Sequence, residues 1–124
     1  MNLTERFDVS PAKVAALLKR IRRLAIDAAR IEERFVRGGG PGGQKTNKTS
    51  NGVVLHYAPL DLTVRCREDR RRTVNRFLAL RELVDRIEMA VSPETSERLR
   101  EIEKVRAAKA KSHRRAVARH HGAE

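Results

Sequence analysis

The chain has 124 residues, with 28 Lys/Arg against 16 Asp/Glu, a formal net charge of +12 at pH 7, four histidines and one cysteine. This length predicts one domain with a modest core, and the single Cys66 excludes an intramolecular disulfide and leaves no zinc-site spacing. No apolar run approaches the roughly 20 residues that cross a bilayer, and residues 1–8 lack a signal-peptide pattern. We therefore expect a cytoplasmic protein that uses no metal or other cofactor and does not enter a membrane.

Positive charge is concentrated in two stretches. Residues 37–76 contain nine Lys/Arg against three Asp/Glu, residues 104–124 contain seven against one, and the remainder balances. Two separate basic surfaces indicate binding to a polyanion. Because the chain has three phenylalanines, one tyrosine and no tryptophan, recognition should rest on phosphates and shape rather than on base stacking.

The first predicted element is an amphipathic helix from Pro11 to about residue 24, within an N-terminal region of residues 1–27. Ser10 is placed to cap it, and proline fits the first helical position. Its apolar residues recur at helical spacing: Val14, Leu17, Leu18, Ile21 and Leu24. The lysines and arginines on its other faces are interpreted as a solvated surface.

A strand and a glycine-rich segment follow. Asp27 can cap a short turn, after which residues 31–36 predict a strand with Ile31 and Phe35 on one face. Residues 37–51 then read Arg-Gly-Gly-Gly-Pro-Gly-Gly-Gln-Lys-Thr-Asn-Lys-Thr-Ser-Asn and hold five of the seven glycines. Such a segment contributes little to a core and is suited to present its backbone to a partner.

The side chains of this segment favour an anionic partner. Gln44 can orient a water molecule, but it does not titrate near neutral pH and cannot act as a strong general base. Arg37, Lys45 and Lys48 surround it, so nucleic-acid phosphate is the obvious candidate.

Three other interpretations of the segment are weaker. Glycine clusters are commonly linkers or turns, but the order Gly-Gly-Gln-Lys-Thr argues against one here. A nucleotide-binding P-loop needs glycine where Gln44 stands and an apolar helix afterwards. A dinucleotide-binding pattern of Gly38, Gly40 and Gly43 fails because the same helix is missing.

Residues 53–57 and 62–66 are strong strand signals joined by residues 58–61. They predict an antiparallel hairpin that turns Arg65 and Arg67 outward, with His56 as an exposed or satisfied strand histidine. The inner face is predicted to hold Val53, Leu55, Tyr57, Leu62, Val64 and Cys66, the cysteine acting as a small buried hydrophobe.

Residues 70–90 predict a second helix that covers the inner face of the hairpin. Its apolar positions recur at helical spacing: Val74, Phe77, Leu80, Val84 and Ile87, with Val91 as a further position at the end. Arg70, Arg71 and Arg72 at its first turn oppose the helix dipole, at up to about 1 kcal/mol each. An RNA contact would explain them, with an ordinary solvated run as the alternative. Residues 28–91 thus form an α+β domain with a small antiparallel sheet of three or four strands.

Ser92-Pro93 predicts the start of a third helix in a C-terminal region of residues 92–124. Its thin apolar line is Leu99, Ile102 and Val105. From residue 104 onward, basic residues spaced by alanines have high helix propensity but little to bury. We expect this tail to be frayed or disordered alone and to order on a polyanion.

The middle of the chain resembles the catalytic domain of class I peptide chain release factors. Gly42-Gly43-Gln44 matches the catalytic tripeptide of that family. The likeness extends to Phe35, Lys45, Thr46, Asn47, Arg70, Asn75 and Arg76, and covers about residues 31–90. Since the chain has no room for codon-reading domains, it is similar to the stand-alone relatives that rescue stalled ribosomes. Pro41, residues 46–51 and the basic tail look closer to the small mitochondrial release factor in rescue than to the immature-colon-carcinoma-transcript type.

This resemblance implies a mechanism. In the family, the loop enters the peptidyl transferase centre of the large ribosomal subunit and promotes attack of water on the ester that joins peptide to tRNA. Gly42 and Gly43 would permit the backbone shape, while the main-chain N–H of Gln44 would stabilise charge on the reacting oxygens. The Gln44 side chain would help to place the water. Residues 38–50 contain no Asp, Glu, His or Cys, so RNA must complete the site.

Two departures from the family pattern concern the second helix and the hairpin turn. Arg71-Arg72 stands where the family usually has Ser-Gln, and a glycine expected in the turn is replaced near Asp61. Neither touches the tripeptide, so they put in question only the ribosome contacts of the helix.

We thus expect a monomeric, codon-independent rescue factor that hydrolyses peptidyl-tRNA and contacts large-subunit rRNA. The predicted RNA-binding residues are Arg37, Lys45, Lys48, Arg65, Arg67, Arg70, Arg71, Arg72, Arg76, Lys104, Arg106, Lys109, Lys111, Arg114, Arg115 and Arg119. Residues 38–50 are expected to be poorly ordered in the free protein. The alternative is a non-catalytic rRNA-binding or ribosome-assembly protein. The sequence leaves open a recruiting partner, and whether the target is a whole stalled ribosome or a split large subunit.

Overall fold

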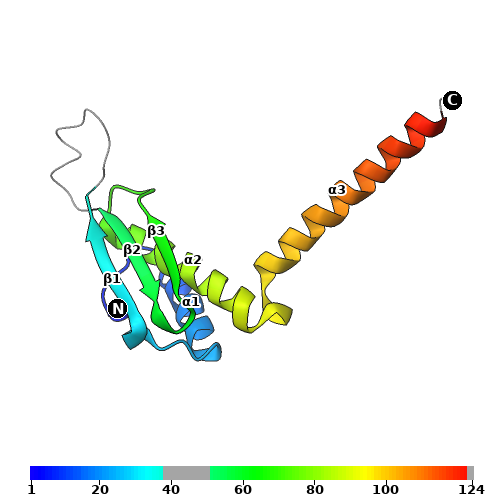
Figure 1. Ribbon diagram of the computed structural model, residues 1–124. Helices are drawn as coiled ribbons and strands as arrows, with labels where there is room; N and C mark the ends of the chain where they lie inside the picture. The colour runs from blue at the N-terminus through cyan, green and yellow to red at the C-terminus, as the bar shows by residue number, and fades with distance from the viewer. Residues whose placement is uncertain (38–50, 123–124) are drawn as a thin grey trace.

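The computed structural model describes residues 1–37 and 51–122, with helices on one side of a small sheet and a long C-terminal helix (Figure 1). Over these ranges the main elements are α1 (Pro11–Arg23), β1 (Ile31–Val36), β2 (Gly52–Tyr57), β3 (Leu62–Cys66), α2 (Arg72–Val91) and α3 (Glu97–Gly122). Short 3₁₀ turns occupy Ala28–Arg30, Ala58–Leu60 and Pro93–Thr95. The predicted α+β class is confirmed.

The sheet is antiparallel in the order β1-β2-β3, which confirms the predicted strands and hairpin. In the register, Val53 lies opposite Cys66, and Leu55 lies between Glu33 and Val64. The inward side chains of β2 are completely or almost completely buried. Asp61 closes the hairpin in the left-handed region, with φ at 50°, the conformation for which glycine is favoured.

The core lies between the sheet and α2, and α1 packs on the other side of α2. Five of the six apolar positions predicted for the second helix are buried, whereas Val91 at its end is 50% exposed; Leu83 on the same helix is buried as well. From the N-terminal segment, Phe7 meets Phe77 edge to face, with ring centroids 6.1 Å apart. Leu17 and Ile21 of α1 join the same core. The predicted amphipathic helix is therefore part of one continuous core with the sheet.

The start of the last helix differs from the prediction. Ser92-Pro93 opens only a 3₁₀ turn, and α3 begins at Glu97. The N-terminal cap is Ser96, whose buried hydroxyl accepts the Leu99 N–H at 3.2 Å. Ser92 instead bonds within the turn, to the side chains of Glu94 and Thr95. The turn reverses the chain before the helix can propagate.

Helix α3 runs without interruption to Gly122 and projects away from the domain (Figure 1). Its 26 residues correspond to about 39 Å. The predicted basic tail, helical or disordered, is helical over the described residues, since alanine, arginine and lysine sustain a helix with almost nothing buried. Its ordering on a polyanion stays a prediction. No helix within residues 1–37 and 51–122 is long and apolar enough to cross a bilayer.

Candidate functional site

The tripeptide Gly42-Gly43-Gln44 lies outside the described residues, as do Lys45 and Lys48, so the expectation about order in residues 38–50 is not addressed either. The structure describes the two points at which this segment leaves the sheet and returns to it, and we call this part of the domain the base of the segment. The segment leaves after β1 and Arg37 and returns at Asn51, next to β2. Both ends are held together, because Val36 and Gly52 are partners in the ladder.

Gly52 is required at the return point by its close neighbours. A Cβ added there would lie 2.7 Å from Val36 Cγ2, 2.9 Å from the Val36 carbonyl oxygen and 2.9 Å from Arg67 Cγ. Only glycine lets the two ends of the segment and the connection after β3 approach this closely.

Asn75 joins the same ends to the start of α2. Its fully buried side-chain amide donates to the carbonyl oxygens of Asn51 and Asp69, each at 2.7 Å. Its Oδ1 accepts the Asp69 N–H at 2.9 Å and lies 3.5 Å from the Cys66 thiol. All hydrogen-bonding capacity of this amide is thus used inside the protein.

Asp69 organises the connection between β3 and α2. Its Oδ1 accepts the Arg71 N–H at 2.8 Å and the Arg71 Nε–H at 3.2 Å. The backbone hydrogen bond from Arg71, followed by the bond from its side chain, holds the pKa of Asp69 below the usual value. Asp69 is therefore an ionised carboxylate that already accepts hydrogen bonds from Arg71. A carboxylate with a lowered pKa is a poor general base.

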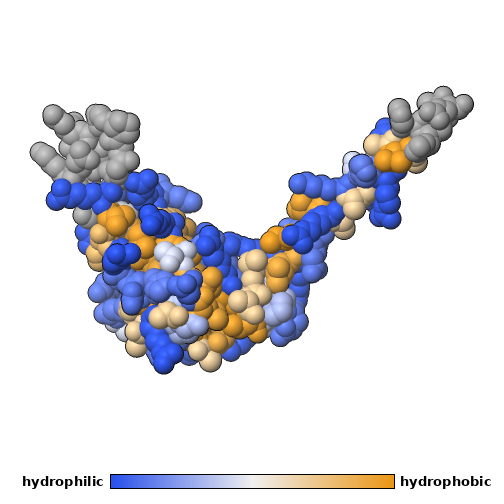
Figure 2. Space-filling view, viewed as in Figure 1, coloured by the Kyte–Doolittle hydropathy of each residue, from blue (hydrophilic) through white to orange (hydrophobic). Residues whose placement is uncertain are grey.

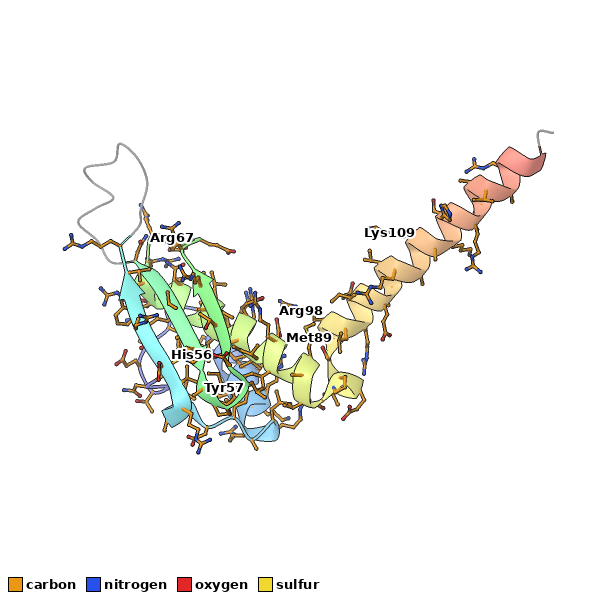
Figure 3. The ribbon with its side chains drawn as sticks, viewed as in Figure 1. His56, Tyr57, Arg67, Met89, Arg98 and Lys109 are labelled. Atoms are coloured by element: carbon orange, nitrogen blue, oxygen red, sulfur yellow. The ribbon has the colours of Figure 1, made fainter. Side chains whose placement is uncertain are left out.

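Five arginines gather around this base, and we call them the loop-base arginines. They are exposed, come from three different segments, and are Arg37, Arg67, Arg70, Arg71 and Arg72. Figure 3 shows Arg67 beside the base. The Arg72 guanidinium lies over the Phe35 ring, 4.2 Å from its centroid. Arg65 is exposed on the outward face of β3.

Arg76 does not belong to this exposed group, although the sequence placed it among the RNA-binding residues. Its side chain is only 2% exposed. Nε donates to Glu33 at 2.7 Å and Nη2 donates to the Asn2 carbonyl oxygen at 3.0 Å. Nη1 lies 3.2 Å from Glu5 but lacks hydrogen-bond geometry. Because the Arg76 guanidinium is buried and bonded to groups of the protein itself, we remove this residue from the predicted RNA-binding residues.

The second group of predicted RNA-binding residues lies on α3. Lys104, Arg106, Lys109, Lys111, Arg114, Arg115 and Arg119 are all exposed. In the view of Figure 2, α3 presents a largely hydrophilic surface. Lys109 and Arg67 lie on separate arms of the molecule (Figure 3). The two basic surfaces predicted from charge are therefore spatially separate.

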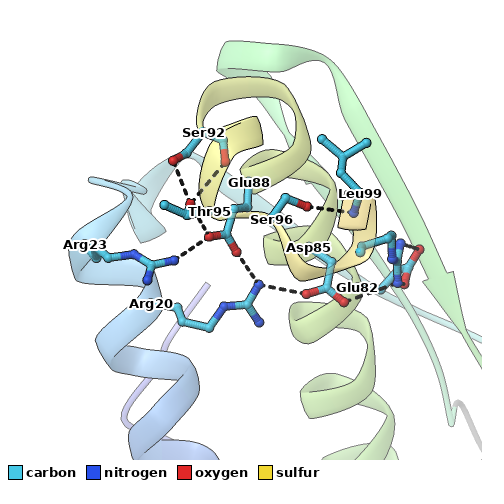
Figure 4. Close-up of polar contacts among 10 residues, drawn as sticks. Arg20, Arg23, Glu82, Asp85, Glu88, Ser92, Thr95, Ser96 and Leu99 are labelled. Carbon is cyan, nitrogen blue, oxygen red and sulfur yellow. Dashed lines mark hydrogen bonds and ion pairs between the residues drawn. The ribbon is translucent and has the colours of Figure 1, made fainter. Parts of the chain in front are cut away.

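A cluster of ion pairs holds the start of α3 against the domain (Figure 4). Glu88 is 3% exposed and accepts hydrogen bonds from Arg20 at 2.8 Å, from Thr95 at 2.7 Å and from Arg23. Burial opposes its ionisation, but the bonds from Thr95 and Arg20 outweigh it and lower the pKa of Glu88. Arg20 and Arg23 are thus part of this cluster, rather than only a solvated face of α1.

Sequence reasoning missed Asn51, Gly52 and Asp69 as residues that shape the site, and it named Asn75 only as a position that matches the family, without a role. The sequence contained one indication for Asn75. It lies at spacings of four from Ala79 and Leu83, on one stripe of the helix, and a polar residue on a buried stripe needs a hydrogen-bond partner. Within the described ranges, no group of three or more His, Cys, Asp or Glu is placed to hold a metal ion.

Comparison with known proteins identifies similar chains. A family model described as the RF-1 domain matches residues 19–123. The zebrafish (Danio rerio) mitochondrial translation release factor in rescue is 50% identical over 70 residues, which cover 56% of this chain and 45% of the relative. The human protein of the same name is 40% identical over 88 residues, covering 71% and 53%. The chain spans about half the length of these curated relatives.

A solved structure is also similar, the solution structure of the mitochondrial disease-related protein C12orf65 (ICT2). It is 42% identical, with coverage of 52% of this chain and 56% of that one, and a TM-score of 0.39.

The expected cytoplasmic location is wrong by this comparison, because these relatives are named as mitochondrial proteins. The physical reason for the error is that a single cysteine and the lack of a long apolar run do not distinguish one reducing compartment from another.

Proposed function

Because this chain belongs to the RF-1 domain family of class I peptide chain release factors, we propose that it rescues stalled ribosomes by hydrolysing the ester of peptidyl-tRNA without reading a codon. The observation that carries the proposal is the tripeptide Gly42-Gly43-Gln44, set between two strands of an RF-1 domain. The reaction takes place in the peptidyl transferase centre of the large ribosomal subunit.

Each residue of the tripeptide has a distinct role in this proposal. Gly42 and Gly43 allow a backbone conformation that side chains would strain. The main-chain N–H of Gln44 stabilises the negative charge that develops on the reacting oxygens. Its side-chain amide helps to orient the attacking water. Proton transfer depends on RNA, because residues 38–50 contain no Asp, Glu, His or Cys and Asp69 is engaged with Arg71.

RNA contacts come from both basic surfaces. The loop-base arginines, together with Arg65, Lys45 and Lys48, bind phosphates around the entry of the segment into the large subunit. The seven cations of α3 bind a second RNA site, either rRNA or an empty mRNA channel. Their location on a separate arm supports two distant contacts on one large partner.

Peptide release from purified ribosomal complexes tests the proposal. Gln44→Ala should bind ribosomes like the parent chain and lose most of the hydrolysis, and Gly43→Ala should lose hydrolysis through backbone geometry. Full release by both variants would overturn the assignment of catalysis to the tripeptide, whereas no release by the parent chain would favour a non-catalytic RNA-binding protein.

The same assay defines the target. Stalled whole ribosomes and separated large subunits that carry peptidyl-tRNA should be compared side by side, with and without the α3 residues from 104 onward. The substrate on which the parent chain is faster identifies the particle it acts on.

A further inference from the structure

Asn75 holds the point at which the glycine-rich segment rejoins the sheet. The acceptor of one of its two amide donors is the backbone carbonyl of Asn51, the first described residue after that segment. The acceptor of the other is the backbone carbonyl of Asp69. One buried side chain thus links the return of the segment, the β3–α2 connection and the second turn of α2.

No other common side chain supplies this set of contacts. The amide offers two donors and an acceptor within one short planar group, which matches two carbonyl oxygens and one N–H. An aspartate at residue 75 would keep the acceptor for the Asp69 N–H but would face both carbonyls without a donor. An apolar residue would remove the partners of the Asn51 carbonyl and the Asp69 N–H, and would leave the Asp69 carbonyl with only the long hydrogen bond of 3.4 Å from Asn51.

The link also fixes cations relative to the segment. Asp69, bound through both its N–H and its C=O to Asn75, in turn orders Arg71 through two hydrogen bonds. The carbonyl of Asn51 is therefore held in a set relation to Arg71. By contrast, among the described residues the side chain of Asn51 makes a single long hydrogen bond, of 3.4 Å, to the Asp69 carbonyl oxygen.

We propose that Asn75 is a positioning residue for peptide release. This inference rests on the proposed function. Asn75 acts through the backbone at residue 51, and setting this end of the segment against the RNA-binding arginines orients the tripeptide. Misplacement of a reacting group by about 1 Å can cost about 100-fold in rate, so a remote link of this kind is expected to affect turnover more than binding.

The test separates turnover from ribosome binding. In Asn75→Asp and in Asn75→Ser, the maximal rate of release should fall by about 10- to 100-fold, while the concentration of protein that gives half-maximal release changes by less than about threefold. The Asp69 amide should exchange faster with deuterium in Asn75→Ser, because the amide oxygen that accepts its N–H is lost, whereas Asn75→Asp keeps an acceptor and should protect this N–H better than Asn75→Ser does. Thermal unfolding shows whether each variant is folded. If one variant does not fold, the release rate of the folded variant is the one that decides.

Two controls isolate the link. Thr73→Val removes a hydrogen bond from the same helix to Asp8, outside the link, and should release peptide at nearly the parental rate. Val74→Ala removes buried volume from the neighbouring position of α2 and measures the effect of lost stability alone. Parental turnover in a folded Asn75 variant, or an equal loss in Val74→Ala, would overturn the inference and leave the proposed function intact. A parent chain that releases no peptide would instead overturn the proposed function, and the inference with it.

Discussion

The guanidinium of Arg98 on α3 donates two parallel hydrogen bonds to the carboxylate of Glu82 on α2, and the Nη1–Oε1 distance is 2.9 Å. The same guanidinium reaches Asp85, one turn further along α2, at 3.2 Å. Bidentate pairing of this kind fixes orientation as well as distance. Together with Glu88 and its partners, it sets the direction in which α3 leaves the domain (Figure 4).

Removing Arg98 should loosen that direction. With spin labels at Thr63→Cys and Ala108→Cys in a Cys66→Ala background, the parent should give a narrow distance distribution, and Arg98→Met a clearly broader one. Arg100→Met is the matched control, because within residues 1–37 and 51–122 the one hydrogen-bond partner of the Arg100 guanidinium is the Glu94 carbonyl oxygen, at 3.3 Å. Equal widths in the two variants would show that the Arg98 pair does not orient α3.

The contribution of Glu82 to stability should depend on pH in a defined window. The hydrogen bond from Arg98 is the largest cause that lowers the pKa of Glu82 to about 2. Since the folded pKa lies below the unfolded value, the stabilisation is fully present above about pH 4.5 and is lost as pH falls toward 2.

Urea unfolding of the parent and of Glu82→Gln measures this effect. The difference in unfolding free energy should be constant from pH 7 to 5, should not exceed about 1 kcal/mol because both partners are partly exposed, and should shrink below pH 4.5. A difference that grows on acidification would contradict the assignment.

Gly52→Ala should destabilise the base of the glycine-rich segment. The added methyl group meets Val36 and Arg67 at less than 3 Å, and overpacking of this kind typically costs about 1–3 kcal/mol. Chemical denaturation measures the loss. Val36→Ala in the same chain should restore only part of it, because the methyl group at residue 52 still meets the Val36 carbonyl oxygen. Complete restoration would show that the side chain alone sets the limit.

Arg76 should prove structural rather than RNA-binding. Glu33→Gln removes its strongest partner and leaves a buried charge, for which losses of about 3–5 kcal/mol are typical. Arg76→Met should lower the unfolding free energy as well, yet leave the salt dependence of ribosome binding unchanged. Arg70→Gln, at an exposed position, should do the reverse. A reduced salt slope in folded Arg76→Met would return this residue to the RNA-binding set.

What the sequence predicted well were the elements with local periodicity. Alternation in β2 and β3 placed Val53, Leu55 and Val64 inward, and helical spacing placed the core face of α2, as the structure has them. What it could not predict were pairings between distant residues. Arg76 looks like its basic neighbours until Glu33, 43 positions away, is brought beside it.

The same limit applies to helix ends and to α1. Ser92-Pro93 has the local form of a helix start, but the cap is Ser96 because the chain must first turn back on α2. Arg20 and Arg23 have the local form of a solvated face, and their partner Glu88 lies on another helix, at least 65 positions away. Charge counts give the size of a basic surface, and the fold decides which cations remain exposed.

Removal of residues 104–124 should flatten the salt dependence of ribosome binding. The seven exposed cations of this part of α3 release counterions when they bind phosphates, and each contact contributes about 0.7 to 0.9 to the slope of log K against log salt. The slope should therefore fall by up to about 5 or 6, measured by sedimentation between 50 and 200 mM salt, which are roughly the concentrations where such effects are large. In a variant with Lys109→Gln and Lys111→Gln, the slope should fall by about 1.5 to 2, since this chain loses two phosphate contacts but keeps the helix. An unchanged slope in the truncated chain would show that α3 does not bind RNA, and would leave the loop-base arginines as the ribosome contact.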